Sequence, residues 1–299
     1  MRQRSRLRNA AEYAAARFLL ATLALLPFSA ALSLAKRYVG LLDRLAPKLR
    51  RTAFRNLEYA WPDLPQERRE QIVNGVFTSI ARLLAVMARF PRIHTANVGQ
   101  WIRYEGFHHF EEALLRGKGV LFATAHLGNW ELSAFAHALM AAPMHVVTRP
   151  LDNPLLEDLA VEYRSLSGNT IIGKKDFVRG ILRALHSNQA VGILIDQNAG
   201  LDDGVFVDFF GHKASTSPSF AKLAARTGAT IIPGYAVWHE DEGRYVLHFD
   251  TPIAMSGDAL VDTQRLQSHL ESVIRRYPDQ WLWIHRRWKT RPAGEDPVY

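Results

Sequence analysis

Short apolar runs that alternate with helical stretches constrain the fold of this chain more than any other feature. The runs follow Gly119, and each leads into a segment of helical character. They span Val120 to Ala125, His145 to Thr148, Ala190 to Ile195 and Thr230 to Trp238. Strands that alternate with helices indicate a largely parallel sheet covered on both faces. We therefore expect an α/β fold, with a mixed, largely parallel sheet flanked by helices on both faces.

Reactive side chains follow three of these predicted strands. His126, Arg149 and Asp196 stand at the carboxyl ends of the first three runs. In sheets of this class, functional groups collect where strands end at their carboxyl side. The sequence therefore predicts a base, a cation and a carboxylate at one edge of the sheet.

The segment from His126 to Glu131 carries the most specific local pattern. It runs from a strand through a tight turn at Gly128 into a helix that starts near Asn129, a favoured N-cap residue. Four residues separate the histidine from the acid, so Glu131 is expected to bind one ring nitrogen of His126 and leave the other as a proton acceptor. The bare spacing also fits a histidine bonded to backbone and a simple helix-start carboxylate. The residues alone leave these alternatives open.

The N-terminus is first basic and then apolar. An uncharged run from Phe18 to Ala35 would form a helix about 27 Å long, just short of a hydrocarbon core of about 30 Å. Pro27 interrupts this run, and cations flank both ends, which favours a helix lying partly in the membrane interface or a short anchor over a clean crossing. A cleaved signal peptide and a buried core helix are the alternatives. The cations before the run are Arg2, Arg4, Arg6 and Arg8.

These patterns predict two parts: a basic, hydrophobic and membrane-associating helix over residues 1–45, and one larger domain over 46–299. Lys+Arg 37 against Asp+Glu 29 gives a net charge of +8, which favours an anionic partner such as nucleic acid, an acidic membrane surface or an acidic carrier protein. The complete lack of cysteine excludes disulfides, thiolate metal sites and a cysteine nucleophile.

Two other classes of function need weighing. The stretch from Trp281 to Arg291 mixes aromatic and basic residues, which suits a nucleic-acid-binding protein and suits a membrane-surface anchor equally well. A metal-dependent hydrolase would use His126, Glu131 and His137, but the chain has no paired-histidine motif of the HExxH type. A P-loop and a dinucleotide fingerprint are also missing. We expect no cofactor and no bound metal. The pair Lys174 and Lys175 is interpreted as part of a solvated loop, with an acidic phosphate or carrier as the alternative partner.

Several motifs in fixed order resemble the bacterial lipid A biosynthesis acyltransferases. These lauroyl and myristoyl transferases belong to the glycerolipid and lysophospholipid acyltransferase superfamily. The resemblance covers most of the chain from about Gly119 to Pro292, and ordered motifs together are more specific than one. The motifs are His126-Leu-Gly-Asn-Trp-Glu131, Asp196-Gln197, Gly204-Val-Phe-Val-Asp-Phe-Phe-Gly211, Ala214-Ser-Thr216, Thr227-Gly-Ala and Trp283-Ile-His-Arg-Arg-Trp-Lys289.

The resemblance implies an acyltransferase domain over 46–299 that acts in lipid A and lipopolysaccharide biosynthesis. It implies transfer of a fatty acyl chain from a thioester, on acyl carrier protein or coenzyme A, to a hydroxyl of a glycolipid. A lipid A precursor is the expected acceptor, and another membrane glycolipid or a phospholipid is the alternative. The implied location is the cytoplasmic face of the bacterial inner membrane, reached by a single N-terminal helix or peripherally. The partners would be the donor, the glycolipid and an anionic membrane surface, with no nucleic acid.

The same resemblance implies roles for individual residues. His126 and Glu131 form the general-base pair of the HX4E motif, although much of the superfamily has Asp in place of this Glu. The longer side chain is still expected to reach the ring. Backbone N–H groups around Gly128 and Asn129, helped by Arg149, are the expected donors to an oxyanion. The residues expected to bind substrate are Gly128, Asn129, Arg149, Asp196, Gln197 and Thr216.

Overall fold

A seven-stranded mixed sheet forms the centre of the protein in a computed structural model that describes residues 5–173 and 177–299. The predictions for Arg2, Arg4, Lys174 and Lys175 lie outside the described residues. The strands lie in the order β1-β9-β8-β2-β5-β3-β4. Their bounds are β1 Ile102–Glu105, β2 Val120–Thr124, β3 His145–Val147, β4 Thr170–Ile172, β5 Ala190–Leu194, β8 Thr230–His239 and β9 Arg244–Phe249.

The sheet is parallel from β8 through β2, β5 and β3 to β4. Only the pairing of β8 with β9 is antiparallel, since β1 runs parallel to β9. All four predicted strands are confirmed within one residue at each end, as is the largely parallel sheet. A separate antiparallel hairpin consists of β6 Val205–Phe209 and β7 His212–Thr216.

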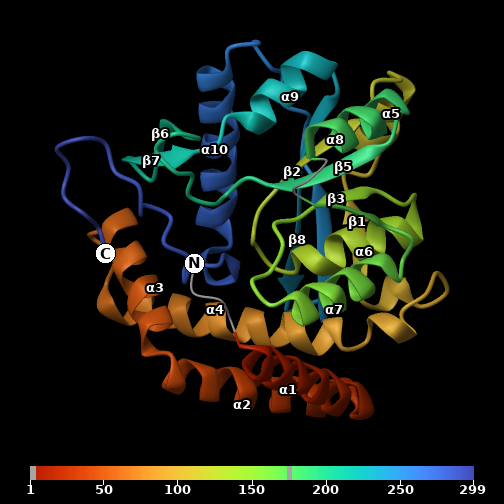
Figure 1. The fold of residues 1–299 in the computed structure, drawn as a ribbon, viewed down its shortest axis with the longest axis vertical. Helices are drawn as coiled ribbons and strands as arrows, with labels where there is room; N and C mark the ends of the chain where they lie inside the picture. Colours follow the sequence, from red (N-terminus) through yellow and green to blue (C-terminus); the bar gives the residue numbers. More distant parts are fainter. Residues whose placement is uncertain (1–4, 174–176) are drawn as a thin grey trace.

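Helices cover both faces of the sheet, as predicted (Figure 1). Alternate residues of β2 face opposite sides, so Leu121 belongs to one buried apolar cluster and Phe122 to the other. The smaller cluster lies under α8, α9 and the middle of α10, and the larger one joins α4, α5 and α6 to the N-terminal helices. The helices are α3 Pro47–Ala60, α4 Gln66–Met87, α5 His108–Leu115, α6 Trp130–Met140, α7 Pro154–Ser165, α8 Phe177–His186, α9 Ser219–Thr227 and α10 Ala259–Arg276.

The N-terminal apolar run forms parts of two helices, which corrects the prediction of a single one. α1 spans Arg6–Leu25 and α2 spans Phe28–Leu45. The break falls at Pro27, whose ring removes a backbone donor and restricts the preceding residue. Within the described residues, none of the helices has the length and apolarity needed to cross a bilayer.

Both N-terminal helices pack on the rest of the protein. Leu20 and Leu23 of α1 and Ala35 of α2 are buried in the larger apolar cluster, together with residues of α4, α5 and α6. Arg89, just after α4, donates to the carbonyls of Leu23 and Leu26 and so holds the corner between the two helices. The division into residues 1–45 and 46–299 stays a prediction, because these contacts join the two parts through one core.

Candidate active site

The turn after β2 holds His126 in place by backbone contacts. Gly128 has φ +60°, and a Cβ there would lie 1.9 Å from the carbonyl oxygen of Ala236, so only glycine fits. The Gly128 N–H donates to the carbonyl of Gln280, and the Asn129 N–H donates to that of Ala236. The Asn129 side chain then caps α6 by accepting from the Leu132 N–H at 2.9 Å. The predicted N-cap is confirmed.

These contacts change the expected role of the turn. The N–H groups of Gly128 and Asn129, expected as donors to an oxyanion, already donate to backbone carbonyls at 2.9 and 2.8 Å. Asn129 is also fully buried. Both residues therefore help to fix the His126 turn. Because both N–H groups already have backbone acceptors, neither is free to donate to a substrate oxyanion.

The partner of the His126 ring is Asp196. The ring Nδ1 lies 2.9 Å from Oδ1 of Asp196, and the His126 backbone N–H donates to Oδ2 at 2.9 Å. Oδ2 also accepts from the indole Nε1 of Trp281 at 2.9 Å. The carboxylate is thus held by three donors, and the ring nitrogen Nε2 is left facing the amide of Gln197 at 3.5 Å.

Sheet register explains this pairing. β2 and β5 are parallel neighbours in which Thr124 pairs with Leu194. Two residues further along, the same register brings His126 beside Asp196 at the carboxyl edge of the sheet. The predicted collection of reactive groups at this edge is confirmed for the base and the carboxylate.

The pair is electrostatically coupled. Burial raises the pKa of Asp196, but attraction to His126 and hydrogen bonds from His126 and Trp281 outweigh it, leaving that pKa at about 2. Burial likewise lowers the pKa of His126, and the charge and hydrogen bond of Asp196 more than compensate, so the His126 pKa lies above its usual value. The ring side chain is 15% exposed and the carboxylate 4%, which leaves only the ring accessible.

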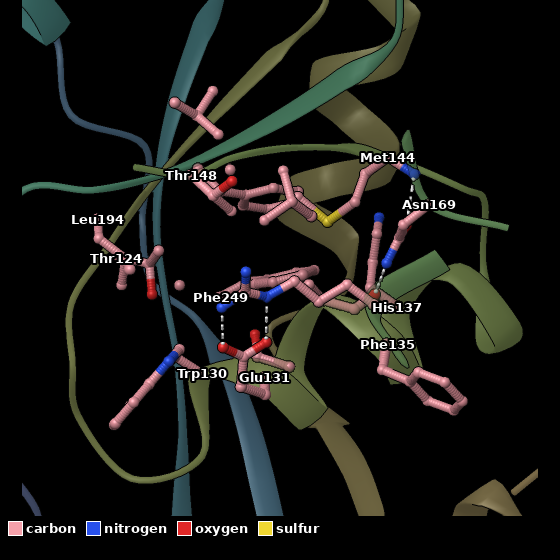
Figure 2. A pocket seen from close by; sticks show the side chains of 18 residues that line it. Thr124, Trp130, Glu131, Phe135, His137, Met144, Thr148, Asn169, Leu194 and Phe249 are labelled. Atoms are coloured by element: carbon pink, nitrogen blue, oxygen red, sulfur yellow. Dashed lines mark hydrogen bonds and ion pairs between the residues drawn. The ribbon is translucent and has the colours of Figure 1, made fainter. Parts of the chain in front are cut away.

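Glu131 binds an arginine in place of the histidine. Its two carboxylate oxygens accept from Nε and Nη2 of Arg164 at 2.8 and 2.6 Å, the two dashed lines beside the Glu131 label in Figure 2. The spacing predicted that Glu131 would bind the His126 ring, and this is corrected: Asp196 occupies that nitrogen, while Glu131 turns toward α7. The ring of Trp130 lies next to the imidazole, with centroids 5.0 Å apart.

An apolar cavity opens beside this ion pair, with about 720 Å³ of empty space that includes open solvent. The cavity lies between α6 and the sheet (Figure 2). Its lining includes three residues that are close to His126 in the sequence, Thr124, Trp130 and Glu131. His137 and Phe135, further along α6, line it together with Met144, the residue just before β3. Apolar walls that carry a few polar groups are typical of a small-molecule pocket.

His137 is built into the wall of this cavity. It is 1% exposed, its Nδ1 lies 2.7 Å from the hydroxyl of Tyr104, and burial lowers the pKa of His137 to about 4. The side chains of His126, Glu131 and His137, considered above for a metal-dependent hydrolase, form no metal-binding cluster in the structure of residues 5–173 and 177–299.

A family model described as bacterial lipid A biosynthesis acyltransferase matches residues 1–290. The chain belongs to this family. It is therefore an acyltransferase, and the resemblance noted from its motifs is confirmed.

Relatives of this acyltransferase align over most of its length. The chain is 26% identical over 281 residues to a lipid A biosynthesis acyltransferase of Haemophilus influenzae, covering 93% of this chain and 88% of the relative. It is 31% identical over 252 residues to the lipid A biosynthesis palmitoleoyltransferase of Escherichia coli, covering 83% and 81%. It is 28% identical over 248 residues to the lauroyltransferase of the same organism, covering 82% and 80%.

The other predicted site residues of this acyltransferase are spread more widely. Gln197 lies at the His126 ring, whereas Arg149 is exposed after β3. Thr216 is buried, where its hydroxyl accepts from the guanidinium of Arg287 at 2.5 Å. The structure brings only Asp196 and Gln197 of the predicted substrate-binding set directly to the ring.

The C-terminal basic and aromatic stretch is part of the core. Trp281, Trp283, Trp288 and Arg287 are each at most 1% exposed. Buried rings cannot stack on bases, so this stretch does not support the nucleic-acid-binding alternative.

Two residues of the site carried no signal in the sequence. Arg164 sits near the end of a helix that looks ordinary, and its partner became visible only through the packing of α7 beside α6. Trp281 begins a stretch that was considered only for nucleic-acid binding or as a membrane-surface anchor. It lies two residues before the motif that begins at Trp283, and no motif pointed to its contact with Asp196.

Proposed function

We propose that this acyltransferase moves a fatty acyl chain from a thioester, on acyl carrier protein or coenzyme A, to a hydroxyl of a lipid A precursor. The observation that carries the proposal is the His126–Asp196 pair, whose imidazole contacts the ring of Trp130 in the wall of the apolar cavity. The names of its relatives support the acceptor class.

The chemistry follows from the protonation of the ring. A lipid hydroxyl is a weak nucleophile, so Nε2 of His126 takes its proton as the oxygen attacks the thioester carbonyl carbon. Asp196 keeps the proton on Nδ1 and stabilises the imidazolium that forms. When the carbon–sulfur bond breaks, the imidazolium returns a proton to the leaving thiolate, so the products are an ester and a free thiol.

Glu131 acts in this proposal through Arg164. The bidentate pair fixes the guanidinium in the wall of the cavity. Its role in this proposal is to stabilise the negative charge that develops on the thioester oxygen. Arg164 would thus perform the task first assigned to the N–H groups of the turn. The acyl chain lies in the apolar cavity between α6 and the sheet.

The location follows from the substrates. A glycolipid acceptor resides in a membrane, and an acyl carrier protein or coenzyme A donor is cytoplasmic, so the enzyme works at the cytoplasmic face of the inner membrane. We propose peripheral association there.

The test is a reconstituted reaction with defined donors and acceptors. Purified protein is incubated separately with lauroyl acyl carrier protein and with lauroyl coenzyme A. Each donor is combined with a lipid A precursor, a phospholipid or a second glycolipid, and the products are identified by mass spectrometry. The expected result is one added acyl group on the lipid A precursor. Acylation of only the phospholipid or the second glycolipid would replace the acceptor, and no acylated lipid from either donor would overturn the proposal.

A further inference from the structure

A buried imidazole in the wall of the apolar cavity has one nitrogen without a hydrogen-bond partner. His137 lines the cavity from α6 and is 1% exposed (Figure 2). Its Nδ1 lies 2.7 Å from the hydroxyl of Tyr104, but its Nε2 has no partner within residues 5–173 and 177–299. A buried polar atom that lacks a partner is destabilising, and such atoms are uncommon in folded proteins.

Aromatic rings surround this imidazole. The ring centroids of Phe110, Phe122 and Phe249 lie 4.6, 5.3 and 5.6 Å from that of His137. Phe122 and Phe249 also line the cavity. Phenylalanine carries no conventional hydrogen-bond donor or acceptor in its side chain. A partner for Nε2 therefore has to come from a molecule that occupies the cavity.

The protonation state of the ring defines the chemistry of that partner. Burial lowers the pKa of His137 to about 4, so the ring is neutral and carries a single proton. If Tyr104 donates to Nδ1, Nε2 is a donor; if Nδ1 donates to Tyr104, Nε2 is an acceptor. A hydroxyl group both donates and accepts, so it can pair with Nε2 in either case. A carboxylate or an amine would lose its hydration here without meeting an opposite charge.

His137 lies deep in the cavity relative to the proposed thioester site. It follows Glu131 by six residues in α6, which is about 9 Å along the helix axis at about 1.5 Å per residue. Its neighbour Phe122 precedes Thr124 by two positions in β2, or about 7 Å along the strand. Because Arg164, bound to Glu131, marks the thioester end in the proposed function, the His137 ring faces the interior of a bound acyl chain.

A second polar atom without a partner lies in the same wall. The buried hydroxyl oxygen of Thr148 has no hydrogen-bond partner in the part of the chain that the structure describes. Thr148 directly follows β3, at the carboxyl edge of the sheet that also holds His126. It is therefore on the thioester side of the cavity, and it offers a matched control for His137.

We propose that the cavity accepts an acyl chain with a hydroxyl group on an internal carbon, and that Nε2 of His137 binds this hydroxyl. The inference rests on the proposed function and deepens it, because it names the chemical class of the donor. The hydroxylated chain is transferred intact. His137 binds the substrate, selects among donors and takes no part in proton transfer. The competing occupant is an unsubstituted chain, with Nε2 bound to water or left unpaired.

The test compares dodecanoyl thioesters that differ in one hydroxyl. Dodecanoate and its 6-, 8- and 10-hydroxy derivatives are supplied on coenzyme A and on acyl carrier protein with a lipid A precursor, and kcat/KM is measured for each. The proteins are wild type, His137→Phe, His137→Gln and Thr148→Val. Phenylalanine keeps a planar ring without a hydrogen-bonding nitrogen, glutamine places an amide near the position of Nε2, and valine removes the Thr148 hydroxyl while keeping its shape.

Wild type should use at least one hydroxylated donor with a kcat/KM at least about tenfold above that of the plain donor. Tenfold corresponds to about 1.4 kcal/mol, the size of one hydrogen bond. His137→Phe should abolish or reverse this preference, because the hydroxyl is then buried unpaired. His137→Gln and Thr148→Val should keep it. No preference in wild type, a preference that survives in His137→Phe, or one that disappears in Thr148→Val would overturn the proposal.

A binding measurement without turnover separates this inference from the proposed function. Wild-type protein labelled with ¹⁵N-histidine is titrated with dodecanoic acid and with each hydroxydodecanoic acid, and His137→Gln identifies the His137 signals. The Nε2 resonance of His137 should shift strongly with a hydroxy acid and little with dodecanoic acid. An equal response to all the acids would overturn the inference even where acyl transfer succeeds. A selective shift in a protein that transfers no acyl chain would support the hydroxyl site and remove the proposed function.

Discussion

Replacing Asp196 with asparagine tests which acid controls His126. Oδ2 of Asp196 accepts from the His126 N–H and from Trp281, so the amide oxygen of the new side chain will stay on that side. Its NH₂ group must then face Nδ1, which becomes an acceptor. The imidazole proton moves to Nε2, and the nitrogen needed as a base is blocked.

Two effects of known size follow. Removing an opposite charge within hydrogen-bond distance lowers a pKa by about 1 to 3 units, so the acidic limb of the pH–rate profile should move down by that amount. The direction of this shift follows from the structure, because Asp196 raises the pKa of His126. Without that charge the His126 pKa is lower, so the ring is neutral, and the rate reaches its plateau, at a lower pH. The wrong tautomer should lower that plateau about 10²- to 10⁴-fold, the usual size of general-base catalysis.

The assay is kcat/KM against pH for wild type, Asp196→Asn and Glu131→Gln, with the His126 tautomer read from ¹⁵N chemical shifts. Asp250→Asn is a matched control, because Asp250 pairs with another histidine, His269, at 2.9 Å. Glu131→Gln should move the acidic limb less than Asp196→Asn and keep the tautomer. A larger shift in Glu131→Gln, or an unchanged tautomer in Asp196→Asn, would refute the reasoning.

Three further changes probe the scaffold and the cavity. Gly128→Ala should lower the free energy of unfolding in urea by more than about 3 kcal/mol, because the new Cβ would collide with a carbonyl oxygen. Gly117→Ala is the control: its Cβ would have no atom within 4 Å, so only the positive φ should cost stability, about 1–2 kcal/mol. Arg164→Met leaves the mostly buried Glu131 carboxylate without its partner and should cost about 2–4 kcal/mol, somewhat less than for a fully buried pair. Ala134→Phe narrows the cavity and should lower kcat/KM for palmitoyl donors far more than for decanoyl donors, by about fourfold for each methylene displaced.

Each of these has its own opposing outcome. Equal losses for the two glycine variants would show that the carbonyl contact is unimportant. A double variant that combines Arg164→Met with Glu131→Gln should recover part of the stability lost by the single change, and no recovery would mean that the pair is not the cause. If Ala134→Phe slowed all donors equally, the acyl chain would not lie along α6.

Local patterns were sufficient for much of the fold. Runs such as Val120 to Ala125 carry the composition of a buried strand, and Asn129 carries the chemistry of an N-cap, so both were predictable without tertiary information. Pro27 was recognised as an interruption of the apolar run. Its consequence, two separate helices that pack on α4, depends on contacts such as those of Arg89 that no local pattern reports.

The sequence predicted which residues belong to the site better than it predicted which of them form hydrogen bonds with one another. His126 and Asp196 were both expected at strand ends, but strand order decides which ends are neighbours, and order depends on long-range contacts. Because β5 lies next to β2, Asp196 is adjacent to the His126 ring and binds the nitrogen that Glu131 was expected to bind. Arg164 is 33 residues from its partner and shares no motif with it, so the cation of the site lay beyond sequence reasoning.

The most direct measurement of the central claim is the rate of the chemical step in His126→Ala under single-turnover conditions, with a lipid A precursor and a labelled acyl thioester. His269→Ala, which removes a different histidine paired with an aspartate, is the control. We predict a rate about 10²- to 10⁴-fold below wild type for His126→Ala and near wild type for the control. A His126→Ala rate within a factor of about three of wild type would contradict general-base catalysis by this ring.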